Sequence, residues 1–140
     1  MTRSTIFLIT LALLLPLPIG AQSNPSALHQ VRTIHVAAMG SSADAERFHT
    51  LLQDELRNVG FEIASTASAA DATLAGEFSS EAQGDYSSAH ATLRLKSPDG
   101  KRMIWSGDYV SQHKGTTPED VVKTLAQTCA ERLHKDWAKN

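Results

Sequence analysis

The chain has 140 residues, which is enough for one domain with a modest core. Thirteen Lys and Arg stand against fifteen Asp and Glu, and this weakly acidic balance argues against nucleic-acid binding, which needs an excess of positive charge on one face. The one cysteine, Cys129, excludes an intramolecular disulfide, so packing must hold the domain together.

Residues 1–21 have the three-part layout of a secretory signal peptide. Arg3 precedes an apolar run that Pro16 ends, and Ala21 supplies the small residue after which cleavage is expected. The run is well short of the roughly 20 residues that cross a bilayer, so no stable membrane anchor is expected after cleavage. Residue 22 is Gln, so no cysteine stands where a lipid would be attached. We therefore expect a periplasmic or secreted protein.

A polar stretch, residues 22–30, is predicted to be a flexible lead-in to a single α/β domain over residues 31–140. The domain opens with a strand, a helix and a short strand, at residues 31–39, 43–59 and 61–64. Cap residues precede the helix and Gly60 follows it. Tight turns between these three elements predict a right-handed crossover with both strands parallel in one sheet.

The next strand, residues 70–78, has a period of two, with Leu74, Gly76 and Phe78 on one side. A glycine inside a strand indicates a bulge or a close approach of another backbone, which we expect where a helix packs on the sheet. A linker of Ser, Thr and Ala at residues 65–70 leads into this strand.

Residues 79–88 are polar and are predicted to be a connection, with Gly84-Asp85 as a candidate turn. Two more strands are predicted at residues 89–96 and 102–111, joined by the turn sequence at residues 97–100. A closing helix begins at the Thr117-Pro118 cap and continues to about Trp137. The predicted fold is a two-layer α/β sandwich, in which two helices cover one face of a mixed sheet of about five strands in the order β-α-β-β-β-β-α.

Two short motifs, in this order of elements, resemble a group of cell-envelope domains. The motif residues are Ala70, Asp71, Leu74 and Gly76, then Gly100, Lys101, Ile104, Trp105, Ser106 and Gly107. The group includes the curli secretion protein CsgG, the N-terminal domain of TolB and the outer-membrane activators of penicillin-binding proteins. The resemblance covers most of residues 31–137 and implies a non-enzymatic envelope module that binds a partner. The chain departs from the group in two ways: many of its members are lipoproteins, whereas this chain lacks the acylated cysteine, and no pore-forming insertion is evident.

The sequence contains none of the common catalytic motifs, such as Gly-x-Ser-x-Gly, His-Glu-x-x-His, Cys-x-x-Cys or a glycine-rich phosphate loop. No catalytic residue and no cofactor are therefore predicted. Residues 39–42 place hydroxyl groups before a helix, where anions can bind, although a capped turn also explains them. A rival hypothesis is a small hydrolase or transferase built from dispersed residues such as Ser42, His35 and Asp71, which would require a concave pocket.

The histidines fall on different predicted elements without the spacing of metal ligands: His29, His35, His49, His90, His113 and His134. Folding could bring His35 and His90 together on the uncovered face of the sheet, but a metal site needs more ligands, so none is predicted. Cys129 lies in the apolar stripe of the last helix and is expected to be a buried, inert thiol.

Four cations cluster around the predicted hairpin: Arg94, Lys96, Lys101 and Arg102. Such charges commonly discourage the pairing of sheet edges; the alternative is an anionic partner such as a lipid head group or a wall polymer. Trp105 and Tyr109 share a predicted strand face with Met103, opposite Ile104 and Val110. They pack in the core if helices cover that face, and otherwise they form an exposed aromatic patch for a partner.

We take these four cations and two aromatic residues as predicted partner-binding residues. The leading hypothesis is an exported, non-enzymatic module that binds an unknown envelope protein or cell-wall component through a sheet edge or an open sheet face, with a homo-oligomer left open. The alternatives are a carrier of a small anion at the hairpin tip and the small hydrolase.

Overall fold

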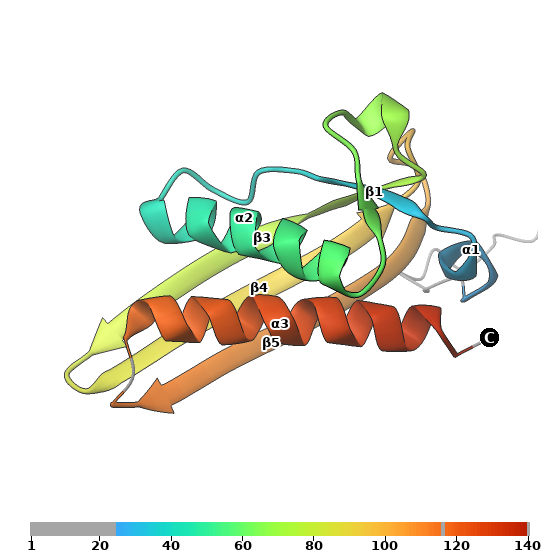
Figure 1. Ribbon diagram of the computed structural model, residues 1–140. Helices are drawn as coiled ribbons and strands as arrows, with labels where there is room; N and C mark the ends of the chain where they lie inside the picture. The colour runs from blue at the N-terminus through green and yellow to red at the C-terminus, as the bar shows by residue number, and fades with distance from the viewer. Residues whose placement is uncertain (1–24, 116, 140) are drawn as a thin grey trace, which may run out of the picture.

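The computed structural model describes residues 25–115 and 117–139 (Figure 1). The predicted signal peptide, residues 1–21, lies outside the described residues. The helices and strands in chain order are α1 (Pro25–His29), β1 (Thr33–Val36), α2 (Ala43–Asn58), β2 (Glu62–Ile63), β3 (Ala72–Gln83), β4 (Tyr86–Lys96), β5 (Met103–Lys114) and α3 (Pro118–Trp137), with a short 3-10 helix, η1 (Ala67–Ala69), between β2 and β3.

The strands form one mixed sheet in the order β2-β1-β3-β4-β5. β1 runs parallel to both β2 and β3, whereas β3, β4 and β5 are antiparallel neighbours. The two long helices, α2 and α3, lie side by side across one face of this sheet (Figure 1). The predicted two-layer α/β sandwich with a mixed five-stranded sheet is confirmed.

The core lies between the sheet and one apolar stripe on each long helix. α2 buries Ala45, Phe48, Leu52 and Leu56. α3 buries Val121, Val122, Leu125, Ala126, Cys129, Ala130 and Leu133. Both helices begin at the predicted caps: the Ser42 hydroxyl accepts from the Ala45 N–H at 3.1 Å, and the Thr117 hydroxyl accepts from the Asp120 N–H at 3.3 Å.

The first described residues form a helix, so the predicted flexible lead-in is wrong for residues 25–29. Leu28 of α1 is only 3% exposed and belongs to the core. The other end of the chain holds this helix in place, because the His29 and Trp137 rings pack 5.5 Å apart and the Trp137 indole donates to the Val31 carbonyl at 3.0 Å. One apolar residue among polar neighbours gives no periodic signal, which is why the sequence did not reveal α1.

β3 and β4 are longer than predicted, because strand pairing continues through residues 79–88, which the sequence indicates to be a polar connection. Gly84, with φ of 57°, forms the turn at the predicted Gly84-Asp85 position. Residues Ser79–Gln83 are exposed on both sides, so they lack the alternation of a half-buried strand. Together with the facing ends of β4 and β5 they form an arm that extends beyond the helices (Figure 1).

A β-bulge changes the predicted faces of β5. Leu95 pairs with Trp105 but the next residue, Lys96, pairs with Met103, so Ile104 is the extra residue. Trp105 therefore faces the helices while Met103 faces the opposite side, and Ile104 is buried in the core. The sequence predicted that Met103 and Trp105 share one face of the strand and that Ile104 lies on the other. This prediction is wrong, because the bulge reverses the face on which Met103 lies.

Gly76 does mark a close backbone approach, but the neighbour is a strand and not a helix. A Cβ atom at this position would lie 1.9 Å from the carbonyl oxygen of Thr92 on β4. Only glycine permits this spacing, so Gly76 sets how closely β3 and β4 approach at the centre of the sheet.

Candidate functional site

The face of the sheet opposite α2 and α3 carries no helix in the described part of the chain (Figure 1). We call it the open face. The outward side chains of three strands form it: Thr73, Ala75, Glu77, Ser79, Glu81 and Gln83 of β3; Tyr86, Ser88, His90, Thr92, Arg94 and Lys96 of β4; and Met103, Ser106, Asp108, Val110, Gln112 and Lys114 of β5. Nearly all are polar, which is typical of a sheet face in contact with water.

One end of the open face is basic. Arg94 and Lys96 project from β4, and Lys101 and Arg102 lie just beyond them in the β4–β5 turn. We call these four residues the basic end. Among the described residues, none of the four forms an ion pair within 4.0 Å. Arg102 does lie near an acid, because the hydrogen bonds from Ser97 and Lys101 lower the pKa of Asp99 and the charge of Arg102 adds to this effect.

The β4–β5 turn is held in one shape by hydrogen bonds. The Ser97 hydroxyl donates to Asp99 Oδ1 at 2.5 Å and accepts from the Arg102 N–H at 3.0 Å. The Lys101 N–H also donates to Asp99 Oδ1, at 3.0 Å. The hydrogen bond from Ser97, followed by that from Lys101, lowers the pKa of Asp99 from its usual range. The turn thus holds the backbone of two of the cations in a fixed position.

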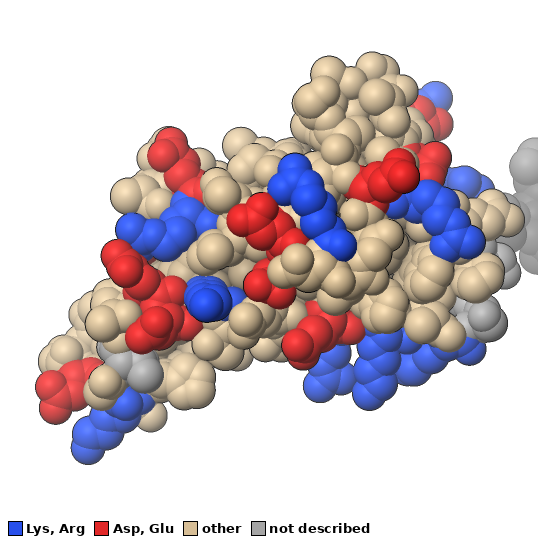
Figure 2. All heavy atoms as spheres, in the orientation of Figure 1, with Lys and Arg blue, Asp and Glu red and all other residues tan. Residues whose placement is uncertain are grey.

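The helix side of the molecule carries a different charge pattern. Figure 2 shows Lys and Arg mixed with Asp and Glu over α2 and the first half of α3. Arg47 lies 3.1 Å from Asp44 and 3.4 Å from Glu119, and Arg57 lies 3.0 Å from Asp54. Pairs of this kind leave little net charge over α2 and the start of α3. Among the described residues, Lys123, Arg132 and Lys135 of α3 also form no ion pair, so the basic end is distinguished by the closeness of its four cations around one turn.

The middle of the open face is acidic. Glu77 and Asp108 lie in one row across the three strands, with Thr92 between them. Asp108 Oδ1 contacts His90 Nε2 in a short hydrogen bond and accepts from the Thr92 hydroxyl at 3.4 Å. The open face therefore changes sign along the strands, from the basic end toward the arm.

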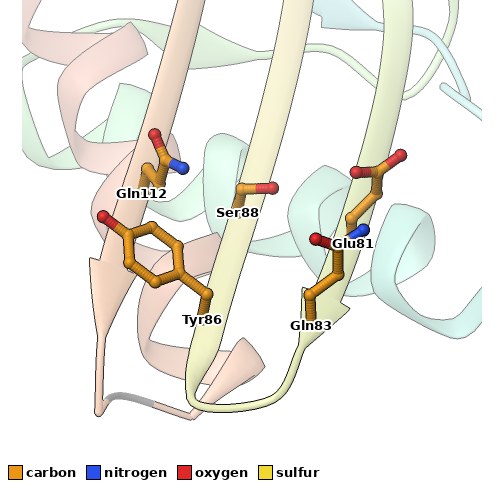
Figure 3. Close-up of a pocket in the computed structure, with 5 residues that line it drawn as sticks. All are labelled: Glu81, Gln83, Tyr86, Ser88 and Gln112. Atoms are coloured by element: carbon orange, nitrogen blue, oxygen red, sulfur yellow. The ribbon is translucent and has the colours of Figure 1, made fainter.

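The arm holds a shallow hollow of about 430 Å³. Figure 3 shows its lining side chains on the side of the strands away from the helices: Glu81 and Gln83 from β3, Tyr86 and Ser88 from β4, and Gln112 from β5. Tyr86 is 44% exposed. Sequence reasoning missed this group, because residues 79–88 are predicted as a connection and not as paired strands.

A second hollow, of about 300 Å³, lies between α1, the start of β3 and the β4–β5 turn. Arg102 and Ser97 line it on one side, and Asp71 and Val31 on the other. The Asp71 carboxylate is engaged, since its Oδ2 accepts from the N–H groups of Arg32 and Thr33 at 2.9 and 3.0 Å. The negative charge of Asp71 in the wall disfavours the binding of a small anion in this hollow.

The structure separates the six predicted partner-binding residues. Trp105 is buried on the helix-covered face, where its indole donates to Asp136 at 2.9 Å. Tyr109 packs against Trp105 with ring centroids 6.2 Å apart, and burial raises the pKa of its phenol. These two aromatic residues pack in the core layer, so only the four cations remain together at an accessible surface.

The residues of the rival hydrolase hypothesis lie apart and have structural contacts. Ser42 caps α2, His35 Nδ1 lies 3.1 Å from the Ala64 carbonyl, and Asp71 binds the start of β1. The start of α2, where Ser42 lies, is close to Ser80 of β3, because the Ser80 hydroxyl donates to Asp44. Asp71 precedes β3 and lies nine residues before Ser80. The three residues therefore do not share a pocket.

The described histidines are also dispersed. His35 lies beside Thr73 and His90 beside Ser79, so the two histidines lie six positions apart along β3. No group of three or more His, Cys, Asp or Glu with the geometry of a metal site occurs within residues 25–115 and 117–139. Cys129 is buried as predicted, and burial raises the pKa of its thiol to about 12.

The fold occurs in solved structures of low sequence identity. The PelC dodecamer from Paraburkholderia phytofirmans matches with a TM-score of 0.57 at 15% identity, over 69% of this chain and 83% of that chain. A minor lipoprotein from Acinetobacter baumannii matches with a TM-score of 0.60 at 13% identity, over 75% and 94% of the two chains. A hypothetical protein from Chlamydia trachomatis matches with a TM-score of 0.59 at 10% identity, over 78% and 99%.

No protein-family model matches the sequence, and no curated protein matches it. At these identities the structural likeness shows the fold alone. The predicted resemblance to the CsgG, TolB and activator domains stays a prediction. Within the described residues, no helix is long and apolar enough to cross a membrane.

Proposed function

We propose that this chain is an exported, non-enzymatic module of the bacterial cell envelope that binds an anionic envelope component through the basic end. The predicted signal peptide supports export. The occurrence of the same fold in an Acinetobacter lipoprotein supports a place in the envelope. Because the sequence identity to these structures is low, we infer the partner from the surface of this chain.

The observation that carries the proposal is a group of four cations that form no ion pair among the described residues: Arg94 and Lys96 on the open face, and Lys101 and Arg102 in the turn beyond it. Cations that lie close together repel one another, and an anion placed among them relieves this repulsion and adds charge-assisted hydrogen bonds. The rigid β4–β5 turn reduces the ordering cost of binding at Lys101 and Arg102. An extended or multivalent anion fits this arrangement best, because the cations lie along a strand and a turn and do not line one pocket.

A small-anion carrier is the second candidate, since a hollow of about 300 Å³ lies beside Arg102. Asp71 in the wall of that hollow opposes it. A small anion would also need enclosure, which an open surface does not give. The two candidates differ in the size of the anion and in the number of charged groups along it. Competition by a small anion such as inorganic phosphate therefore distinguishes a small-anion carrier from a module that binds an extended anion.

The test is capture of envelope components on the immobilised chain, over a range of salt concentrations. The comparison is a triple variant, Lys96→Glu, Lys101→Glu and Arg102→Glu. A matched control reverses three exposed cations of α3, Lys123→Glu, Arg132→Glu and Lys135→Glu, with the same change in net charge. We expect the first variant to lose what the native chain retains and the control to keep it. Equal retention by all three proteins contradicts the proposal, and competition by inorganic phosphate favours the small-anion carrier.

A further inference from the structure

β5 forms an outer edge of the sheet and is unusually poorly protected. It is twelve residues long, lies next to β4 only, and contains no proline. Edge strands usually avoid pairing with other chains by being short or by carrying Pro or Lys along their length. The bulge of β5 lies near its beginning, and Lys114 is its last residue. The remaining edge is therefore a template for another strand.

We propose that β5 pairs with β5 of a second copy, antiparallel and about a two-fold axis at Ser111, so that two five-stranded sheets become one. In this register Val110 lies opposite Gln112 of the second copy, Tyr109 opposite His113, and Asp108 opposite Lys114. This interface is separate from the basic end, so a failure of either proposal leaves the other standing.

The charges of β5 are self-complementary in this register. Asp108 and Lys114 are its only acid and its only Lys or Arg, and their even spacing places both on the open face. Two-fold pairing places Asp108 of each copy opposite Lys114 of the other copy, so two ion pairs form, each with its Cβ atoms about 5 Å apart. Asp108 Oδ2 has no hydrogen-bond partner among the described residues, because His90 and Thr92 both contact Oδ1. Moving the axis to Val110 would place Asp108 opposite Gln112 and lose both pairs.

Ser111 gives an independent reason for the position of the axis. Its side chain faces the helices, is only 6% exposed, and has a buried hydroxyl without any hydrogen-bond partner in the described chain. Buried hydroxyl groups normally have partners. On the axis, Ser111 lies directly opposite Ser111 of the second copy, and rotation about χ1 allows the two hydroxyl groups to bond to each other.

The most exposed large apolar side chain of the described residues also lies on this edge. Val110 is 65% exposed on the open face. In the proposed register it lies opposite the aliphatic stem of Gln112 and diagonally across from Val110 of the second copy, so the pairing removes its methyl groups from water.

The other sheet edges are less suitable for a second copy. β2 has two residues, too few for stable pairing. The part of β3 beyond its pairing with β1 carries Glu77 and Glu81 on the open face, so it would oppose Asp108 with like charges. Self-pairing of β5 instead places Asp108 of each copy opposite Lys114 of the other copy.

The test is the concentration dependence of the mass of the purified chain, measured by sedimentation and by light scattering. We expect a dimer at micromolar concentrations. Asp108→Lys and Lys114→Asp should each raise the dimer dissociation constant at least about tenfold, since each puts like charges opposite each other twice. The double variant Asp108→Lys with Lys114→Asp should restore the dimer. A chain that is monomeric at all concentrations, an assembly larger than a dimer, or a dimer unaffected by both single reversals overturns the proposal.

The register has its own test by oxidation. Ser111→Cys should cross-link two copies through one disulfide, because opposite residues of paired strands lie within disulfide distance. His113→Cys is the matched control, since its counterpart lies about 14 Å away, four residues along the strand. Native Cys129 is buried and does not interfere. Cross-linking by the first variant alone supports the register, and cross-linking by neither or by both overturns it.

Discussion

Replacing Gly76 by Ala tests how the sheet is held together. The added Cβ would lie 1.9 Å from the Thr92 carbonyl oxygen and 3.1 Å from the Leu93 Cα, both backbone atoms. Since Cβ atoms almost never approach another atom within 3.0 Å, β3 and β4 would have to separate by about 1.1 Å at this pair. A hydrogen bond of about 2.9 Å does not survive that separation.

The expected loss of stability follows from this displacement. Two neighbouring hydrogen bonds at about 1 kcal/mol each, with about 1–3 kcal/mol of overpacking strain, give a loss of about 3–5 kcal/mol. That is a large share of the 5–15 kcal/mol typical of whole domains. Urea unfolding followed by tryptophan fluorescence measures it.

Gly107→Ala is the matched control. There the obstacle is the ring of Tyr109, 2.4 Å from the added Cβ, and a side chain can rotate away. We expect a loss of about 1–2 kcal/mol at this position. If Gly76→Ala unfolds within about 0.5 kcal/mol of the native chain, or is milder than Gly107→Ala, the backbone argument is refuted.

Two further predictions concern Asp71 and Cys129. Asp71→Ala removes the acceptor of the Arg32 and Thr33 N–H groups; because water reaches both bonds, we expect a loss of about 1–2 kcal/mol in urea unfolding, and a smaller loss for Asp71→Asn. An equal loss for the two variants would contradict this role. Cys129 should react with a thiol reagent only after unfolding. Since its pKa rises from 9.0 to about 12 on folding, its contribution to stability is complete below pH 9 and is lost as pH rises toward 12. We expect the native chain to lose about 1.4 kcal/mol between pH 8 and pH 10, and Cys129→Ala to lose clearly less. Equal losses would show that another group causes the change.

The order and type of most elements were predictable because they are half-buried. β1, the first half of β3, and β4 alternate in burial, while α2 and α3 have an apolar stripe with a cap in front. The arm was not predictable for the same reason, since a strand exposed on both faces has no alternation. The bulge at Ile104 was not predictable either, because it depends on how β5 meets β4.

Part of the candidate site was predictable. The four cations of the basic end lie close in sequence around a recognisable turn, so their proximity follows from the hairpin. Trp105 and Tyr109 lie on the same hairpin, but the helices decide which face is covered. Asp108, Val110 and Ser111 gave no signal, because their importance comes from the position of β5 at the edge of the sheet.

The contact between Trp137 and the first residues of the domain has a consequence for how the chain is made. α3 supplies seven buried side chains, and its last residue donates to the Val31 carbonyl. Until α3 is complete, the sheet lacks the buried side chains that this helix supplies, and the Val31 carbonyl lacks its donor. The domain can therefore close its core only after Trp137 has been made. A chain cut before Trp137 should be more sensitive to proteases than the native chain.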